Sequence, residues 1–107
     1  MEFIELVQKA RLIRSKYAAL EKKKYGKEWS SSNLMEGFVG DVGDLMKLVM
    51  AKEGLRETDN VDEKLSHELS DCFWSILVLA DKYNINLEAE FVKTMDSLET
   101  KIDDENV

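Results

Sequence analysis

The chain has 107 residues, no proline, 44% hydrophobic residues and a formal net charge of −7. A single domain covering residues 1–107 is expected, and the acidic balance argues against nucleic acid as a partner, because no basic block could release counterions. The longest apolar run, Ile76 to Ala80, is too short to cross a membrane, and Met1 to Leu6 lack the basic and apolar regions of a signal peptide. We therefore expect a cytoplasmic protein with no membrane partner.

Apolar residues recur at helical spacing along the chain and predict an all-α fold of four helices without strands. The first helix is expected from about Glu2 to Lys24, and it should stop before Gly26. Ser30 to Asn33 offer N-caps for a second helix that runs to about Lys52 and is closed by Gly54.

Two further helices are predicted in the second half of the chain. Asp59 to Asp62 can start a third helix that ends near Asn84, and Asn86 can cap a short fourth helix. The tail from Asp103 to Val107 is expected to fray. The fourth helix carries apolar residues at helical spacing, namely Leu87, Phe91, Met95, Leu98 and Ile102.

Two acidic doublets, Asp41-x-x-Asp44 and Glu68-x-x-Asp71, stand in helical segments that otherwise carry little charge. A carboxylate in an apolar stretch is costly unless something compensates its charge. Both doublets lie on the same flank of an apolar arc, so the four acids can converge if the two helices pack antiparallel. Such a cluster suits an oxygen-preferring cation, Mg²⁺ or Mn²⁺. The alternative is that both doublets are solvated helix edges, as most Asp and Glu side chains are.

The apolar arcs beside the doublets predict the core. They consist of Leu34, Phe38, Val42, Leu45, Met46 and Val49 in the second helix, and of Leu65, Leu69, Cys72, Phe73, Ile76, Leu79 and Tyr83 in the third. Cys72 is therefore expected to be a buried structural thiol. Trp74, Leu77 and Val78 lie outside the arc and make the third helix apolar on more than one face. This predicts a homo-oligomer with Trp74 at a subunit interface.

Three glycines, Gly37, Gly40 and Gly43, lie beside or between the first two acids, and each costs a helix on the order of 1 kcal/mol relative to Ala. They serve either close helix packing or clearance for a bulky ligand. The sequence has no phosphate-binding loop motif, and its only histidine, His67, is not part of the Glu-x-x-His pattern of di-iron bundles.

The residues around the doublets resemble a known family. Gly40 to Leu45 resemble the G-E-V-G-E-L segment of MazG-like all-α nucleoside triphosphate pyrophosphohydrolases, and Glu68 to Asp71 resemble their E-x-x-D motif. Asn33-Leu34 resembles the N-L that opens the same helix in the dCTP pyrophosphatase branch. The resemblance covers about Trp29 to Ile102 and implies a four-helix bundle-like MazG-type fold, assembled as a homodimer or a dimer of dimers. In this chain both acids of the first doublet are Asp where the family usually has Glu.

The resemblance implies Mg²⁺-dependent hydrolysis of a nucleoside triphosphate, NTP or dNTP, to its monophosphate and pyrophosphate, with a role such as nucleotide-pool cleaning. The expected metal ligands are the four doublet acids, and one of them, or Glu36, would orient the water. Trp29, Asn33, Lys93 and Asp96 are the candidate substrate contacts. Two alternatives stay open: a non-catalytic helical interaction module with a degenerate metal site, and an enzyme like phosphoribosyl-ATP pyrophosphohydrolase.

Overall fold

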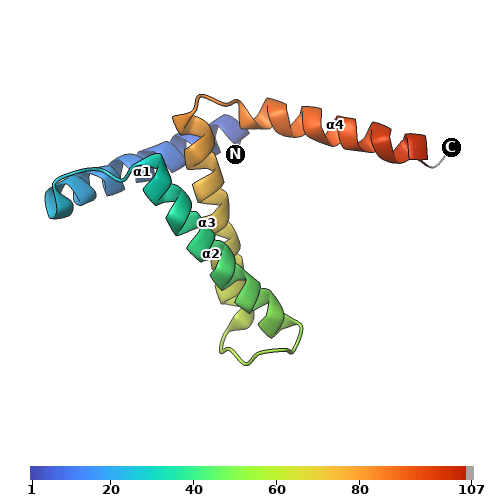
Figure 1. The fold of residues 1–107 in the computed structure, drawn as a ribbon, viewed down its shortest axis with the longest axis horizontal. Coiled ribbons are helices and arrows are strands. Elements are labelled where there is room, and N and C mark those ends of the chain that lie inside the picture. The colour runs from blue at the N-terminus through green and yellow to red at the C-terminus, as the bar shows by residue number, and fades with distance from the viewer. Residues whose placement is uncertain (106–107) are drawn as a thin grey trace.

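A computed structural model describes residues 1–105, which form four α-helices and, within that range, no strand (Figure 1). The helices are α1 (Phe3–Tyr25), α2 (Ser31–Lys52), α3 (Val61–Lys82) and α4 (Leu87–Glu105). The all-α class and the four helices expected from the sequence are confirmed. The expected fraying is wrong for residues 103–105, which continue α4, and residues 106 and 107 lie outside the described part. None of these four helices is both long and apolar enough to cross a membrane.

The helix ends follow local sequence signals. Gly26 ends α1 with a φ of 80°, a left-handed conformation that glycine adopts without strain. At the start of α2, the Ser30 hydroxyl accepts a hydrogen bond from the Asn33 backbone N–H, and the Asn33 side-chain oxygen accepts one from the Ser30 N–H. This reciprocal pair satisfies two N–H groups of the first turn. The Asn86 side chain caps α4 by accepting from the Ala89 N–H at 3.1 Å.

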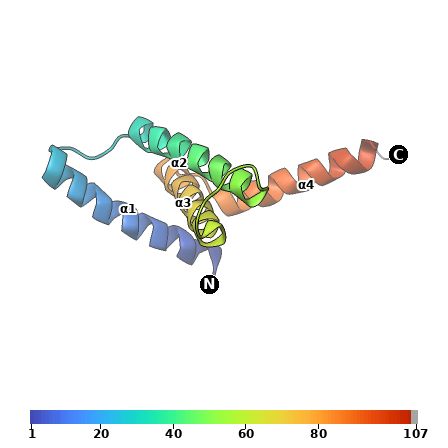
Figure 2. The same ribbon diagram turned by 90° about the horizontal axis from the view of Figure 1, so that it is seen from below.

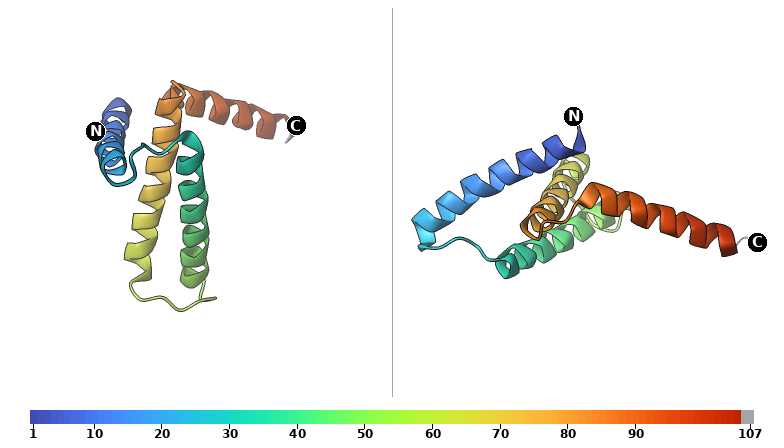
Figure 3. Two further views of the ribbon diagram at one scale, coloured as in Figure 1. Left: turned by 60° about the vertical axis from the view of Figure 1, so that its left-hand side comes forward. Right: turned by 90° about the horizontal axis from the view of Figure 1, so that it is seen from above.

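The helices α2 and α3 form an antiparallel hairpin, and α1 packs against the half of α3 nearest its C-terminal end (Figures 1 and 3). Buried residues of three helices meet there: Ala10 of α1, Leu34 of α2, and Leu77 and Val78 of α3. Partly buried residues surround this small core, including Phe3, Leu6, Val7 and Leu87. Figure 2 shows α1 standing off from the hairpin toward its own C-terminal end, where the connection to α2 closes the gap.

Polar contacts also join α1 to α3. The Arg11 guanidinium donates two hydrogen bonds to the Asp81 carboxylate, at 3.0 and 2.6 Å, and holds the pKa of that carboxyl below its usual range. The Trp74 indole N–H donates to the Ala10 carbonyl at 3.2 Å, and its ring lies 5.9 Å from that of Tyr17 between centroids. Trp74 therefore packs against α1 of its own chain, and its place at a subunit interface stays a prediction.

The predicted apolar arcs are mostly uncovered in the single chain. Leu34 and Cys72 are buried, which confirms the buried thiol, but Met46 is 60% exposed. Other exposed members of the arcs are Val42, Val49, Leu69, Phe73, Ile76 and Tyr83. The arcs were predicted as core because they are the most apolar faces of the two helices. The structure instead buries Leu77 and Val78 against α1, because α1 packs on the other apolar face of α3.

Beyond its first residue, α4 leaves the body of the molecule (Figures 1 and 3). None of its side chains is buried, and its apolar residues Phe91, Val92, Met95, Leu98 and Ile102 are exposed. One chain therefore does not close the expected four-helix bundle within residues 1–105. The radius of gyration is 17.3 Å, whereas a compact domain of this length has about 13 Å.

Candidate metal centre and its two cavities

The antiparallel hairpin brings acids of both doublets together. One carboxylate oxygen each of Asp41, Asp44 and Glu68 lie within 4.8 Å of one another. Asp41 and Glu68 are half-buried and Asp44 is exposed. Within residues 1–105, no Lys or Arg forms an ion pair with these three side chains. None of the three carboxylates is therefore neutralised by a direct ion pair to Lys or Arg in this part of the chain.

Asp71, the fourth acid, lies close enough to act on the cluster but has a partner of its own. Its carboxylate is 3.2 Å from Nε2 of His67, one turn earlier on α3, and both side chains are well exposed. His67 is thus a surface residue. The negative charge of Asp71 still contributes to the shifted pKa values of Asp41 and Glu68.

Burial and mutual repulsion act on the cluster in the same direction. Burial raises the pKa of Asp41, and the negative charges of Asp71 and Asp44 raise it further. Burial likewise raises the pKa of Glu68, with added contributions from the three other acids. A divalent cation would relieve this repulsion, because it favours the charged form of each carboxylate. The donor set of carboxylate oxygens fits Mg²⁺ or Mn²⁺.

The four acids lie between two cavities. The first, of about 630 Å³, lies between α1 and the hairpin and is bounded by Asp41 and Asp71. Its other walls are largely aromatic, and they include Tyr17, Tyr25, Trp29 and Trp74, with Arg14 and Lys24 as basic residues. The second, of about 690 Å³, is bounded by Asp44 and Glu68 together with Lys47, Arg56, Lys64, His67 and Glu63. An aromatic cavity and a cavity of mixed charge, which contains Lys47, Arg56 and Lys64, thus meet at the acids.

The remaining predicted site residues lie in different parts of the structure. Trp29 lines the aromatic cavity. The side-chain oxygen of Asn33 is engaged in the capping pair with Ser30. Glu36 is exposed and lines a separate shallow depression on α2 with Ser32, Met35 and Val39. Lys93 and Asp96 lie on the projecting α4, away from the hairpin. Sequence reasoning missed the basic residues of the second cavity, because Lys47, Arg56 and Lys64 are scattered over α2, the connecting loop and α3.

The three glycines of α2 differ in their surroundings. A Cβ at Gly37 would lie 3.8 Å from the Trp29 ring, whereas a Cβ at Gly40 or Gly43 would meet no atom within 4 Å. Within the described chain, the close-packing hypothesis therefore does not apply to Gly40 and Gly43. Clearance for a ligand or a neighbouring molecule stays as the explanation for these two positions.

We expect Gly40→Ala to stabilise the isolated chain by on the order of 1 kcal/mol, because helix propensity improves and no contact is disturbed. The melting temperature followed by circular dichroism should rise by roughly 4–8 °C. Gly54→Ala is the matched control: its site is equally open, but its φ is 82°, so the same change should destabilise the protein. A lower melting temperature for Gly40→Ala would mean that another molecule packs against this position.

The arrangement can bind a cation, an aromatic ring on one side of it and an anion on the other. Three carboxylates that meet at one point supply hard oxygen ligands, the tryptophans and tyrosines supply flat apolar surfaces, and Lys47, Arg56 and Lys64 supply positive charge. No known protein family, no curated protein and no solved structure matches this chain when sequences and folds are compared.

Proposed function

We propose that the protein is a Mg²⁺-dependent nucleoside triphosphate pyrophosphohydrolase, which converts an NTP or dNTP to its monophosphate and pyrophosphate. The observation that carries the proposal is the acidic cluster, which has no direct ion pair to Lys or Arg within residues 1–105, at the boundary between an aromatic cavity and a cavity that contains three basic residues. A nucleotide has the matching order of parts, with a planar base at one end and a phosphate chain at the other. The resemblance of the two doublets to those of MazG-like enzymes supports the same activity.

Each part of the site has a defined role in this proposal. Asp41, Asp44, Glu68 and Asp71 would hold the metal, and a bound Mg²⁺ would supply charge neutralisation of the triphosphate and an activated water for in-line attack at phosphorus. One carboxylate of the cluster, or Glu36, would orient that water and take its proton. The phosphates lie toward Lys47, Arg56 and Lys64, and the base lies toward Trp29.

A second copy of the chain is part of the proposal. The exposed surface is 8411 Å², whereas a compact monomer of 12.3 kDa has about 6,100 Å². The excess of about 2,300 Å² lies within the range that a subunit of an obligate oligomer buries. Exposed apolar residues on α2 follow the alternating spacing of four and three that suits packing against another helix: Met35, Val39, Val42, Met46 and Val49.

We therefore propose a homodimer or a dimer of dimers. The exposed apolar residues of α2 and α3, together with α4, of one subunit are covered by another subunit. Lys93 and Asp96 lie on α4, which points away from the hairpin of its own chain (Figure 1). As substrate contacts they would act at the site of a neighbouring copy. Glu36 is exposed on α2 and would likewise act at the site of a neighbouring copy.

The test is pyrophosphate release from a panel of canonical and modified NTPs and dNTPs, with and without Mg²⁺. We expect monophosphate and pyrophosphate in equal amounts, complete dependence on Mg²⁺ or Mn²⁺, and loss of activity with a chelator. Phosphoribosyl-ATP belongs in the panel, because cleavage of that compound alone would favour the second enzyme class. Release from none of these compounds would reject the enzyme and leave the helical interaction module as the better hypothesis.

A further inference from the structure

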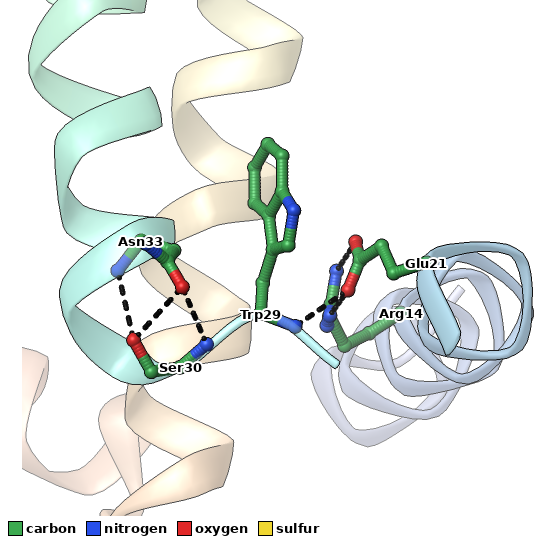
Figure 4. Close-up of polar contacts among 5 residues, drawn as sticks. All are labelled: Arg14, Glu21, Trp29, Ser30 and Asn33. Atoms are coloured by element: carbon green, nitrogen blue, oxygen red, sulfur yellow. Dashed lines mark hydrogen bonds and ion pairs between the residues drawn. The ribbon is translucent and has the colours of Figure 1, made fainter. Parts of the chain in front are cut away.

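Glu21 is the one buried charged residue among those that the structure describes, with 7% of its surface exposed. Its partner is Arg14, two turns earlier on α1, whose guanidinium donates to both carboxylate oxygens at 2.9 and 2.5 Å (Figure 4). Arg14 lowers the pKa of Glu21, so the pair is ionised at neutral pH. A charge is expensive to bury, and a buried pair of this kind adds little to stability compared with apolar residues of similar size. Its presence calls for another explanation.

Glu21 also accepts a hydrogen bond from the connection between α1 and α2. The backbone N–H of Trp29 donates to Oε1 of Glu21 at 2.8 Å. The next residue, Ser30, is held by the capping pair with Asn33. Trp29 is therefore fixed from both sides, by α1 through Glu21 and by the first turn of α2.

The backbone held in this way determines where the indole, of which 43% is exposed, leaves the chain. Figure 4 shows the Trp29 ring standing between α1 and α2, and its Cζ3 atom is 3.8 Å from the position of a Cβ on Gly37. Arg14, Trp29 and Leu34 line both the aromatic cavity and a neighbouring cavity of about 500 Å³. These three side chains thus form the partition that closes the aromatic cavity on this side.

The aromatic cavity has a second prepared surface. Trp74 is held by the hydrogen bond from its indole N–H to the Ala10 carbonyl, and it packs against Tyr17. Both tryptophans of the chain are thus held by a hydrogen bond to α1, one through its backbone and one through its ring. An aromatic surface that is fixed before a ligand arrives loses less conformational freedom on binding.

We infer that Arg14 and Glu21 are positioning residues, which hold Trp29 as a preformed stacking surface for the base of the nucleotide. This inference rests on the proposed function, because that function supplies the nucleotide. The pair does not touch the acids of the metal cluster. It therefore acts on binding of the base and leaves the metal and the chemical step unchanged.

The kinetic test uses the double variant Arg14→Met/Glu21→Met, which removes both charges and the acceptor of the Trp29 N–H and leaves no buried charge unpaired. We expect KM for the best nucleotide of the panel to rise on the order of tenfold, as for loss of one base–aromatic stack, with kcat within about twofold. Mn²⁺ affinity, measured without nucleotide, should not change. Arg11→Met is the matched control, because it breaks the other Arg–carboxylate pair of α1, with Asp81, and should leave KM unchanged.

A binding test does not depend on turnover. In Trp74→Phe, Trp29 is the only tryptophan, so its fluorescence reports its surroundings directly. We expect dCMP or dAMP to quench this fluorescence, and the double variant to lose the quenching while acrylamide reaches the ring more easily. If no nucleotide is hydrolysed but quenching depends on the pair, the proposed enzyme fails and the base site stands.

Two outcomes would overturn the inference. One is an unchanged KM in a double variant whose Trp29 has become accessible to acrylamide, because the pair would then only fasten the loop. The other is absence of quenching by either nucleotide in Trp74→Phe. If the double variant loses its helical circular dichroism, Arg14→Lys replaces it, since Lys keeps the charge but not the two-pronged geometry. Arg14→Lys should then show a smaller rise in KM, and an unchanged KM would reject the inference.

Discussion

Asp41→Asn together with Glu68→Gln should lower Mg²⁺-dependent pyrophosphate release by more than about 100-fold. The variant removes two proposed metal ligands, and this should cost more activity than the change of a residue that only orients a ligand. Mn²⁺ binding should be lost in parallel. The control is Glu2→Gln with Glu5→Gln, which neutralises a pair of the same spacing at the start of α1 and should keep full activity. Normal turnover in the first double variant would remove these residues from the catalytic site.

The same double variant should be more stable than the wild type when no metal is present. Asp41 and Glu68 have raised pKa values in the folded chain, so between the unfolded and folded values the native state binds more protons. The stability of the metal-free wild type should therefore fall as pH rises from about 4 through the raised pKa values, and this slope should shrink in the variant. Urea denaturation at pH 4 to 8 with a chelator measures it. Added Mg²⁺ should restore stability to the wild type only.

The second large effect is expected for the exposed arc on α3. Phe73→Glu should convert the assembly to monomer, because a buried, unpaired carboxylate costs several kcal/mol and appears in both copies of a symmetric contact. Light scattering should then report a species of about 12 kDa, with lower activity than the wild type. Phe73 is 42% exposed in the single chain, so the variant should keep its helical circular dichroism.

The control for this variant is Ile4→Glu, which places the same charge on an exposed apolar residue of α1, outside the arcs, and should not alter the assembly. A wild-type protein that is monomeric and fully active at nanomolar concentration would contradict the proposed oligomer. In that case the exposed arcs on α2 and α3 would have to be covered by a different protein.

Local features of the fold could be predicted from the sequence. Gly26, the Ser30 and Asn33 pair and Asn86 end or begin helices through contacts within a few residues, so their effect is visible in the sequence. The meeting of the two doublets could also be predicted, because sequential helices joined by a short loop usually pack antiparallel. This prediction needed only the position of the acids on the same flank of each helix.

Features that depend on distant parts of the chain could not be predicted. Two faces of α3 are apolar, and only the position of α1 decides that Leu77 and Val78 become core while Phe73 stays uncovered. The contact of Glu21 with the Trp29 N–H depends on the path of a loop, which spacing does not show. The direction of α4 was equally hidden, because its apolar stripe fits a partner helix from its own chain or from another.

The isolation of α4 links folding to concentration. A helix of 19 residues without buried side chains is only marginally stable in water, since its backbone hydrogen bonds barely offset the loss of chain entropy. In a dilute solution of single chains, α4 should interconvert rapidly with random coil while the hairpin persists. Association between subunits would then fold α4 and bury it in the same step. The entropy lost in ordering α4 would weaken assembly and make the transition between subunits and oligomer sensitive to small changes in protein level.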